Sequence, residues 1–134
     1  MKQASGNVAV EWARLWTAHD VEGLLALFTE DAQYHDLALG HSFRGQTELR
    51  AFFESTFVTF PDFKMALGES VIDENAAAGE WEMSGTFAGE SFGEAPTGKT
   101  FRVKGCCFMR LTQGRIREHR DYWNPRSFDE QVGI

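Results

Sequence analysis

The stretch Ile116-Arg-Glu-His-Arg-Asp-Tyr-Trp-Asn-Pro125, near the end of the chain, is the most informative part of the sequence. Side chains alternate between the two faces of a β-strand, so in a strand His119, Asp121 and Trp123 share one face. An imidazole and a carboxylate beside a large aromatic ring suit acid/base chemistry in a pocket that holds a flat apolar molecule. The alternative is a solvated edge strand, but a tryptophan on the same face argues against full exposure. The stretch therefore predicts a strand with a pocket on one side.

The sequence before this stretch also has strand patterns, separated by turn signals. Four strands are expected, at about 63–72, 76–88, 99–112 and 115–123. In the second of them Trp81, Met83 and Phe87 alternate with polar residues, which is typical of a sheet with one dry and one wet face. The glycine-rich segment 89–98 predicts a long loop, which is either a pocket rim or a hairpin tip.

The first sixty residues have helical patterns instead. Apolar residues at Val8, Trp12, Leu15 and Trp16 recur at helical spacing, and Asp20 can cap a following helix. Three helices are expected, at about 7–19, 21–29 and 47–59, with a short β-like stretch at 33–36 and then a loop that contains Gly40 and Gly45.

These elements predict an α+β fold, because helices gathered on one side of an antiparallel sheet make that class. The 134 residues suffice for one core, and we expect a single domain over residues 1–134. A strongly curved sheet closed by three N-terminal helices leaves a conical cavity, where sites are usually found. The 12 phenylalanines and 4 tryptophans exceed what a small core needs, so some of them can line that cavity.

Charge and apolar pattern argue against several classes of partner. A net charge of -7 and an isoelectric point near 5.0 oppose binding to nucleic acid, and no cluster of lysine and arginine compensates. No apolar run approaches the ~20 residues of a membrane span, and Glu11 and Arg14 interrupt the region where a signal peptide is apolar. We therefore expect a cytoplasmic protein without a nucleic-acid or membrane partner. Cys106 and Cys107 are adjacent, which predicts free thiols.

Six segments carry a resemblance to a known family. They are Ala18-His-Asp-Val-Glu22, Leu24-Leu-Ala-Leu-Phe-Thr-Glu-Asp31, Phe43-Arg-Gly45, Phe60-Pro-Asp-Phe63, Pro96-Thr-Gly98 and Gly114-Arg-Ile-Arg-Glu-His-Arg-Asp-Tyr-Trp123. In this order and spacing they resemble the SnoaL-like polyketide cyclase branch of the NTF2-like superfamily, over nearly the whole chain. The resemblance implies an NTF2-like cone-shaped roll with a deep apolar cavity, commonly a homodimer through the outer face of the sheet.

The resemblance also implies a role for the final strand. In characterised SnoaL-like cyclases an aspartate in its H-R-D motif is the general acid/base of an intramolecular aldol condensation, without metal or cofactor. That position is Asp121 here. His119, on the same face, would either polarise the carbonyl oxygen of the substrate or pair with Asp121. The chain departs from those cyclases at Cys107, where they have a histidine, and a thiol is a poor hydrogen-bond partner beside an imidazole.

Besides the catalytic pair, side chains on several elements are expected to contact an apolar or aromatic small molecule. They are His35, Trp81, Met83, Cys107, Trp123 and Trp16. We expect no cofactor and no metal. Two histidines and a carboxylate could in principle hold a metal, but no spacing on a single element supports such a site. Its candidate ligands are His35, Asp36, His41 and His119.

Three functions remain open from the sequence. The leading one is a cofactor-independent cyclase or isomerase that removes a proton next to a carbonyl group, with Asp121 as the base. The second is a small-molecule binding module with the same cavity and no turnover. The third is a ketosteroid-isomerase-like double-bond isomerase, which requires a tyrosine or a protonated acid facing the base. Tyr122 is expected on the wrong face of its strand to serve.

Overall fold

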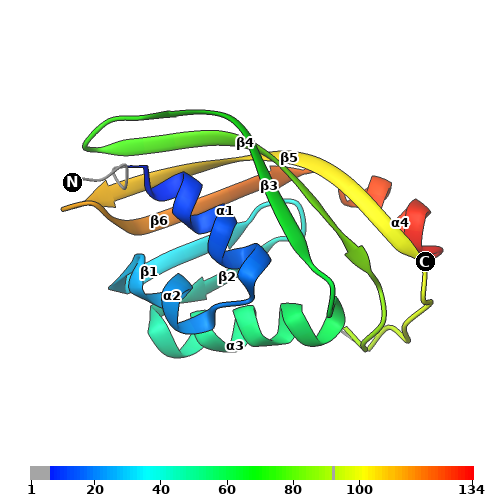
Figure 1. Cartoon of the computed structure of the whole chain (residues 1–134). Helices are drawn as coiled ribbons and strands as arrows, with labels where there is room; N and C mark the ends of the chain where they lie inside the picture. Colours follow the sequence, from blue (N-terminus) through cyan, green and yellow to red (C-terminus); the bar gives the residue numbers. More distant parts are fainter. Residues whose placement is uncertain (1–6, 92) are drawn as a thin grey trace.

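The computed structural model describes residues 7–91 and 93–134, and it confirms the α+β fold (Figure 1). The elements of the described chain are, in order, α1 (Val8–Ala18), α2 (Val21–Ala26), β1 (Phe28–Asp36), β2 (His41–Arg44), α3 (Gly45–Thr59), β3 (Lys64–Ile72), β4 (Ala76–Thr86), β5 (Thr100–Thr112), β6 (Arg115–Trp123) and α4 (Pro125–Val132). The four strands expected after residue 63 are all present, with ends that differ by two residues or fewer.

The strands of the described chain join one sheet in the order β2-β1-β6-β5-β4-β3. β1 runs parallel to β6, whereas every other neighbouring pair is antiparallel. The pairing of β3 with β4 shifts register between Leu67 and Ser70, and that of β5 with β6 shifts between Arg110 and Leu111. Such irregularities bend strands. Figure 1 shows the long strands β4 and β5 arching over α1 and α3.

The boundary between α2 and β1 differs from the expected one. Asp20 caps α2 through its side chain, as predicted. The helix is shorter than the expected 21–29, because Phe28 already pairs with Ile116 of β6 and is fully buried. The short β-like stretch expected at 33–36 is therefore only the end of a nine-residue strand.

Two elements, β2 and α4, lie where no element is expected from the sequence. β2 is a four-residue edge strand that pairs only with β1 in the described chain, so its apolar pattern is too short to stand out. α4 has Pro125 in its first turn, and the side chain of Asn124 accepts a hydrogen bond from the Arg126 N–H. Asparagine followed by proline is a recognised helix start, so the sequence does carry the signal for α4.

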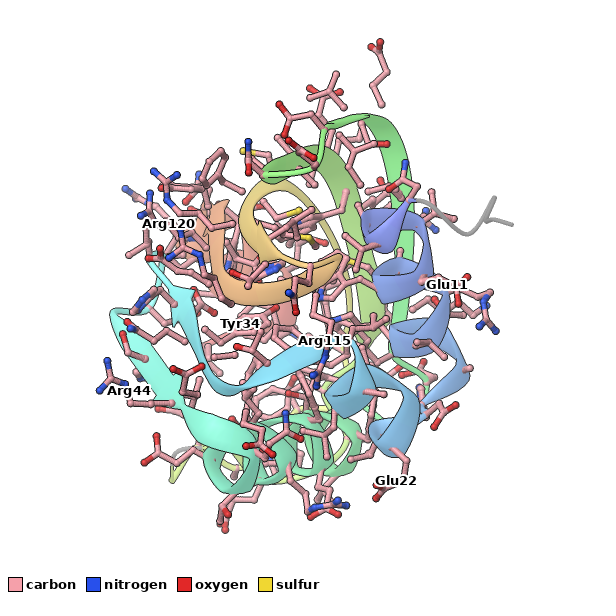
Figure 2. The ribbon with its side chains drawn as sticks, turned by 90° about the vertical axis from the view of Figure 1, so that its left-hand side faces the viewer. Glu11, Glu22, Tyr34, Arg44, Arg115 and Arg120 are labelled. Carbon is pink, nitrogen blue, oxygen red and sulfur yellow. The ribbon has the colours of Figure 1, made fainter. Side chains whose placement is uncertain are left out.

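The core lies between the helices and the concave face of the sheet. Its large side chains that are fully shielded from solvent include Trp12, Phe28, Leu49, Phe53, Met109 and Ile116. Figure 2 shows Tyr34 in this interior, whereas the labelled Glu11, Glu22, Arg44 and Arg120 lie at the outside. No helix in residues 7–91 and 93–134 is long and apolar enough to cross a membrane. Because the core is shielded from water, a polar side chain on the concave face has to find its hydrogen-bond partners within the protein.

Candidate active site

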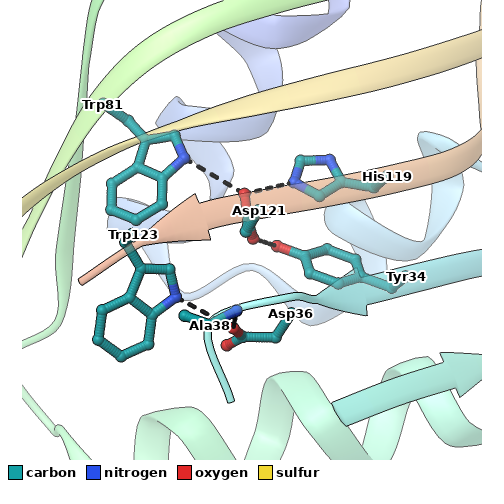
Figure 3. Close-up of polar contacts among 7 residues, drawn as sticks. All are labelled: Tyr34, Asp36, Ala38, Trp81, His119, Asp121 and Trp123. Atoms are coloured by element: carbon teal, nitrogen blue, oxygen red, sulfur yellow. Dashed lines mark hydrogen bonds and ion pairs between the residues drawn. The ribbon is translucent and has the colours of Figure 1, made fainter. Parts of the chain in front are cut away.

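A cluster of polar side chains surrounds Asp121 on the concave face of β6. The hydroxyl of Tyr34 donates a hydrogen bond of 2.6 Å to Oδ2, and Nε1 of Trp81 donates one of 3.2 Å to Oδ1. Nε2 of His119 lies 2.8 Å from the same Oδ1 (Figure 3). Because Asp121 is only 7% exposed, these three side chains replace most of the water that a carboxylate binds.

Strand pairing brings the members of this cluster together. Tyr34 on β1 lies beside His119 on the parallel strand β6. On β4, Trp81 pairs with Gly105 of β5, and a Cβ at that glycine would lie 2.6 Å from Cη2 of the indole. Gly105 therefore leaves the room that lets the Trp81 indole extend across β5 and reach Asp121.

His119 is fully buried and contacts Asp121 from the side away from solvent. Its ring stacks against Trp12 and Tyr34, with centroid distances of 4.9 and 4.3 Å. Nδ1 is buried and has no hydrogen-bond partner among the described residues. A proton on Nδ1 would be unsatisfied, so we assign the proton of a neutral imidazole to Nε2, which donates it to Asp121. The geometry is that of pairing with Asp121, the second of the two roles considered for His119.

A cavity of about 340 Å³ opens beside this cluster, with Asp121 in its wall. Residues of α1, α3 and α4, the sheet, and the loop between β4 and β5 all contribute to it. Its apolar and aromatic walls include Trp16, Tyr34, Phe52, Met65, Trp81 and Trp123. A concave apolar space with a few converging polar groups is the usual form of a small-molecule site.

A second carboxyl group, that of Asp36, faces the same cavity. Asp36 ends β1 and pairs with Asp121 of β6. Its Oδ1 accepts hydrogen bonds from Nε1 of Trp123 at 3.1 Å and from the backbone N–H groups of Ala38 and Leu39 at 3.1 and 3.2 Å. Burial raises the pKa of Asp36, and the nearby charge of Asp121 raises it further, while these donors partly offset the rise. Asp36 and Asp121 thus face the same cavity in different environments.

The family of the chain follows from its sequence as a whole. A sequence model of the SnoaL-like domain matches residues 9–119. The chain belongs to the SnoaL-like domain family. The matched region includes Tyr34, Trp81 and His119 and ends just before Asp121. No curated protein matches this SnoaL-like chain in sequence.

Solved structures similar to this SnoaL-like chain confirm the fold. A protein with a ketosteroid isomerase-like fold from Catenulispora acidiphila DSM 44928, in complex with trimethylamine, is 20% identical with a TM-score of 0.84, covering 96% of this chain and 93% of that chain. IdmH from Streptomyces antibioticus, described as a candidate polyketide cyclase, is 23% identical with a TM-score of 0.79, covering 95% and 96%. A candidate polyketide cyclase from Pseudomonas putida KT2440 is 23% identical with a TM-score of 0.82, covering 98% and 100%.

The structure brings most of the predicted site residues of the SnoaL-like chain into one place. Asp121, Trp16, Trp81, Met83 and Trp123 all line the cavity. Trp16 comes from α1, whereas the other four come from β4 and β6. Trp81 and Met83 share a face of β4, and Asp121 and Trp123 share a face of β6, because side chains alternate along a strand.

His35 lies outside this site, and its predicted contact with a ligand is not supported. Tyr34 points to the concave face, so its neighbour His35 points to the other face. There Nδ1 lies 2.8 Å from Oγ of Ser42, and Nε2 lies 3.5 Å from a carboxylate oxygen of Glu118. His35 is absent from the residues that line the cavity.

Cys107 is likewise outside the cavity lining, next to Asp121 in the sheet. Burial raises the pKa of its thiol to about 12, and the charge of Asp121 adds to that effect. Cys107, His119 and Asp121 each place one potential metal-ligating atom within 4.8 Å of the others. This set shares only His119 with the candidate ligands named from the sequence, because His35, Asp36 and His41 are not part of it. Asp121 of this set already accepts hydrogen bonds from Tyr34, Trp81 and His119, so most of its lone-pair sites are occupied in the structure.

Tyr34 is the site residue that sequence reasoning misses. The only tyrosine considered as a partner of the base is Tyr122, which is 42% exposed. Tyr34 is 1% exposed, and its burial, together with the charge of Asp121, raises its pKa well above the ordinary 10.0. It therefore keeps its proton and acts as a donor. The available signal is its alternation with Asp36 on the predicted stretch 33–36.

Proposed function

We propose that this SnoaL-like protein removes a proton next to a carbonyl group in an apolar, conjugated small molecule, with Asp121 as the base and without a cofactor. The observation that carries the proposal is a carboxylate fixed by three side chains in the wall of an apolar cavity. Removal of such a proton is the step that an intramolecular aldol cyclase and a double-bond isomerase have in common. The proposal therefore covers both reaction types.

The hydrogen bonds of Asp121 leave it able to accept a proton. An ionised carboxylate has about four lone-pair sites, and Tyr34, Trp81 and His119 occupy three of them. The remaining site is available to a substrate in the cavity. The three contacts also hold the carboxyl plane in one orientation, so the base keeps a fixed position relative to a bound substrate. In this proposal His119 positions Asp121 and does not touch the substrate.

A developing enolate needs a hydrogen-bond donor near the substrate oxygen. Trp16 lines the cavity and is 2% exposed, and its Nε1 has no hydrogen-bond partner in the described part of the chain. That N–H is enclosed by protein atoms, so the donor in the cavity wall is one of the two groups that already bond to Asp121, the Tyr34 hydroxyl or the Trp81 N–H.

Double-bond isomerisation is the second candidate, and Tyr34 is the observation that favours it. Such a reaction requires an acid that faces the base. Tyr34 lines the cavity, and its hydroxyl is 2.6 Å from Asp121 Oδ2. A shift of Tyr34 from the carboxylate to a substrate oxygen would supply that acid. A binding module without turnover is the third reading, and the Catenulispora protein with its bound trimethylamine is one example of this fold holding a small organic molecule.

The experiment is hydrogen exchange in deuterated water. Wild type and Asp121→Asn are incubated with a panel of conjugated polyketide esters and β,γ-unsaturated ketones, and mass spectrometry follows deuterium uptake next to the carbonyl. Asp31→Asn is the matched control, because it makes the same chemical change at an exposed site on β1. We expect wild type and Asp31→Asn to accelerate uptake and Asp121→Asn to lose the acceleration.

The products separate the candidates. A migrated double bond identifies an isomerase, and a new ring identifies a cyclase. Binding of panel compounds without any uptake by wild type contradicts the proposed chemistry and supports the binding module.

A further inference from the structure

The charged side chains around the cavity are acidic, and His41 is the one basic side chain in its described lining. Acidic residues from four parts of the fold line it, namely Asp36 on β1, Glu90 and Glu94 in the loop between β4 and β5, Asp121 on β6 and Asp129 on α4. Among the described residues that line the cavity there is no lysine and no arginine. A cleft with apolar walls concentrates the field of such charges and attracts ligands of the opposite sign. A ligand whose recognition depends on a phosphate or carboxylate group therefore meets no lysine or arginine in this lining and has five acidic side chains against it.

Asp36 is the acid best placed to pair with a charged ligand. Its Oδ1 is fully used by Trp123, Ala38 and Leu39, whereas Oδ2 receives no hydrogen bond from the described chain. Asp36 is half-buried, so Oδ2 has lost part of its water without gaining a protein donor. A donor from the ligand would fill this place. A cationic donor would also offset the repulsion between Asp36 and Asp121.

The aromatic walls suit the same kind of group. Trp123, which donates to Asp36, also lines the cavity, together with Trp81 and Tyr34. The faces of aromatic rings attract ammonium groups, most strongly when the rings belong to tryptophan and the site is shielded from water.

We propose that the ligand of this cavity is a cation, with an apolar ring body and a protonated alkylamine that pairs with Oδ2 of Asp36 beside the Trp123 indole. The inference rests on the proposed function only in taking this cavity as the binding site. It does not require that Asp121 performs catalysis. The volume of about 340 Å³ limits the ring body to a few fused rings.

Three probes with one naphthalene body test the charge preference. The first is N,N-dimethyl-2-naphthylmethylamine, which is cationic at pH 7. The other two are the neutral 2-naphthalenemethanol and 2-naphthaleneacetate, the anion of 2-naphthaleneacetic acid. Binding of each to the full chain is measured by calorimetry at low and high salt. We expect the amine to bind about tenfold tighter than the alcohol, the acetate to bind weakest, and salt to reduce the difference.

Asp36→Asn is the decisive variant, because the asparagine Oδ1 can accept the same three hydrogen bonds and should keep the local fold. The preference for the amine should fall to about twofold or less, with affinity for the alcohol unchanged. Asp31→Asn, an exposed acid outside the cavity lining, should keep the full preference.

Equal binding of amine and alcohol, no binding of the amine at millimolar concentration, or a preference that survives in Asp36→Asn would each overturn the inference. These outcomes are distinct from failure of the proposed function. Deuterium uptake that depends on Asp121, without any amine preference, removes this inference alone. Amine preference without uptake removes the proposed chemistry alone.

Discussion

The hydroxyl of Tyr34 donates a 2.6 Å hydrogen bond to Oδ2 of Asp121, although the two residues are 87 positions apart in the sequence. The contact exists because β1 lies parallel to β6 and places Tyr34 beside His119, two residues from Asp121. No turn or helix could produce it locally. The orientation of the candidate base therefore depends on the one parallel strand pair in the described sheet.

Tyr34→Phe removes this hydrogen bond and leaves the ring in place. Asp121 then loses one buried donor, so we expect the free energy of unfolding to fall by roughly 1.5–3 kcal/mol, the range for hydrogen bonds to charged groups. Urea unfolding measures the change. Tyr122→Phe makes the same substitution at an exposed position and should change stability by less than about 0.5 kcal/mol. Equal losses in the two variants would show that the buried hydroxyl has no special contribution.

Asp36 should make stability depend on pH in an unusual direction. Burial raises its pKa in the folded state above the ordinary 3.8, so the folded chain holds the proton at pH values where the unfolded chain has lost it. Stability from this group therefore falls as pH rises from about 3.8 through the folded pKa, and stays low above it. Asp36→Asn should remove that fall, so the free energy of unfolding of the variant should rise relative to that of wild type as pH increases. Urea unfolding across pH 4 to 8 tests this.

Asp62 provides the control of opposite sign. Burial opposes ionisation there, but hydrogen bonds from the Thr86 hydroxyl and backbone N–H lower the pKa of Asp62 on balance. Its contribution to stability is present above the unfolded pKa and is lost as pH falls through the folded pKa. The stability of Asp62→Asn should therefore fall relative to that of wild type as pH rises from below the folded pKa of Asp62 to just above 3.8, so its unfolding is also followed below pH 4. The same sign for both variants would contradict the assigned environments.

Gly105→Ala should disturb the site without touching its polar groups. The added Cβ would lie 2.6 Å from Cη2 of Trp81 and 2.6 Å from the backbone oxygen of Tyr122. The indole has to move, which weakens its bond to Asp121 and costs roughly 1–3 kcal/mol of stability. Tryptophan fluorescence and urea unfolding report both effects. Gly68→Ala is the control, because its Cβ would meet nothing closer than 3.4 Å.

The two adjacent cysteines should react very differently. Cys106 is exposed, whereas Cys107 is 2% exposed and burial raises the pKa of its thiol to about 12. Thiolates are the reactive form, so iodoacetamide at neutral pH should label the native chain once, at Cys106, and the urea-unfolded chain twice. Mass spectrometry counts the labels. Native labelling of Cys106→Ser would mean that Cys107 is accessible after all.

Much of the site could be predicted from the sequence, because its signal is local. The shared face of His119, Asp121 and Trp123 follows from the period of two along a single strand, and the same holds for Trp81 and Met83. The register shifts and the arch of the sheet do not alter which face these residues occupy.

The rest of the site required long-range pairing. Alternation within β1 places Tyr34 and Asp36 on one face, but only the parallel pairing of β1 with β6 decides that this face meets the cavity. The position of His35 outside the cavity lining has the same origin, because the partner strand decides which face of β1 meets the cavity. In contrast, the signal for α4 at Asn124 and Pro125 is local and was available.

The most direct test of the central claim compares rate with affinity for Asp121→Asn. For a compound in which wild type accelerates deuterium uptake, the single-turnover rate constant and the Kd are measured for both proteins. The account predicts a rate that falls about 10²- to 10⁴-fold while Kd stays within about threefold, because the base acts in the transition state. An unchanged rate, or a loss fully explained by a weaker Kd, would contradict the assignment of Asp121 as the base.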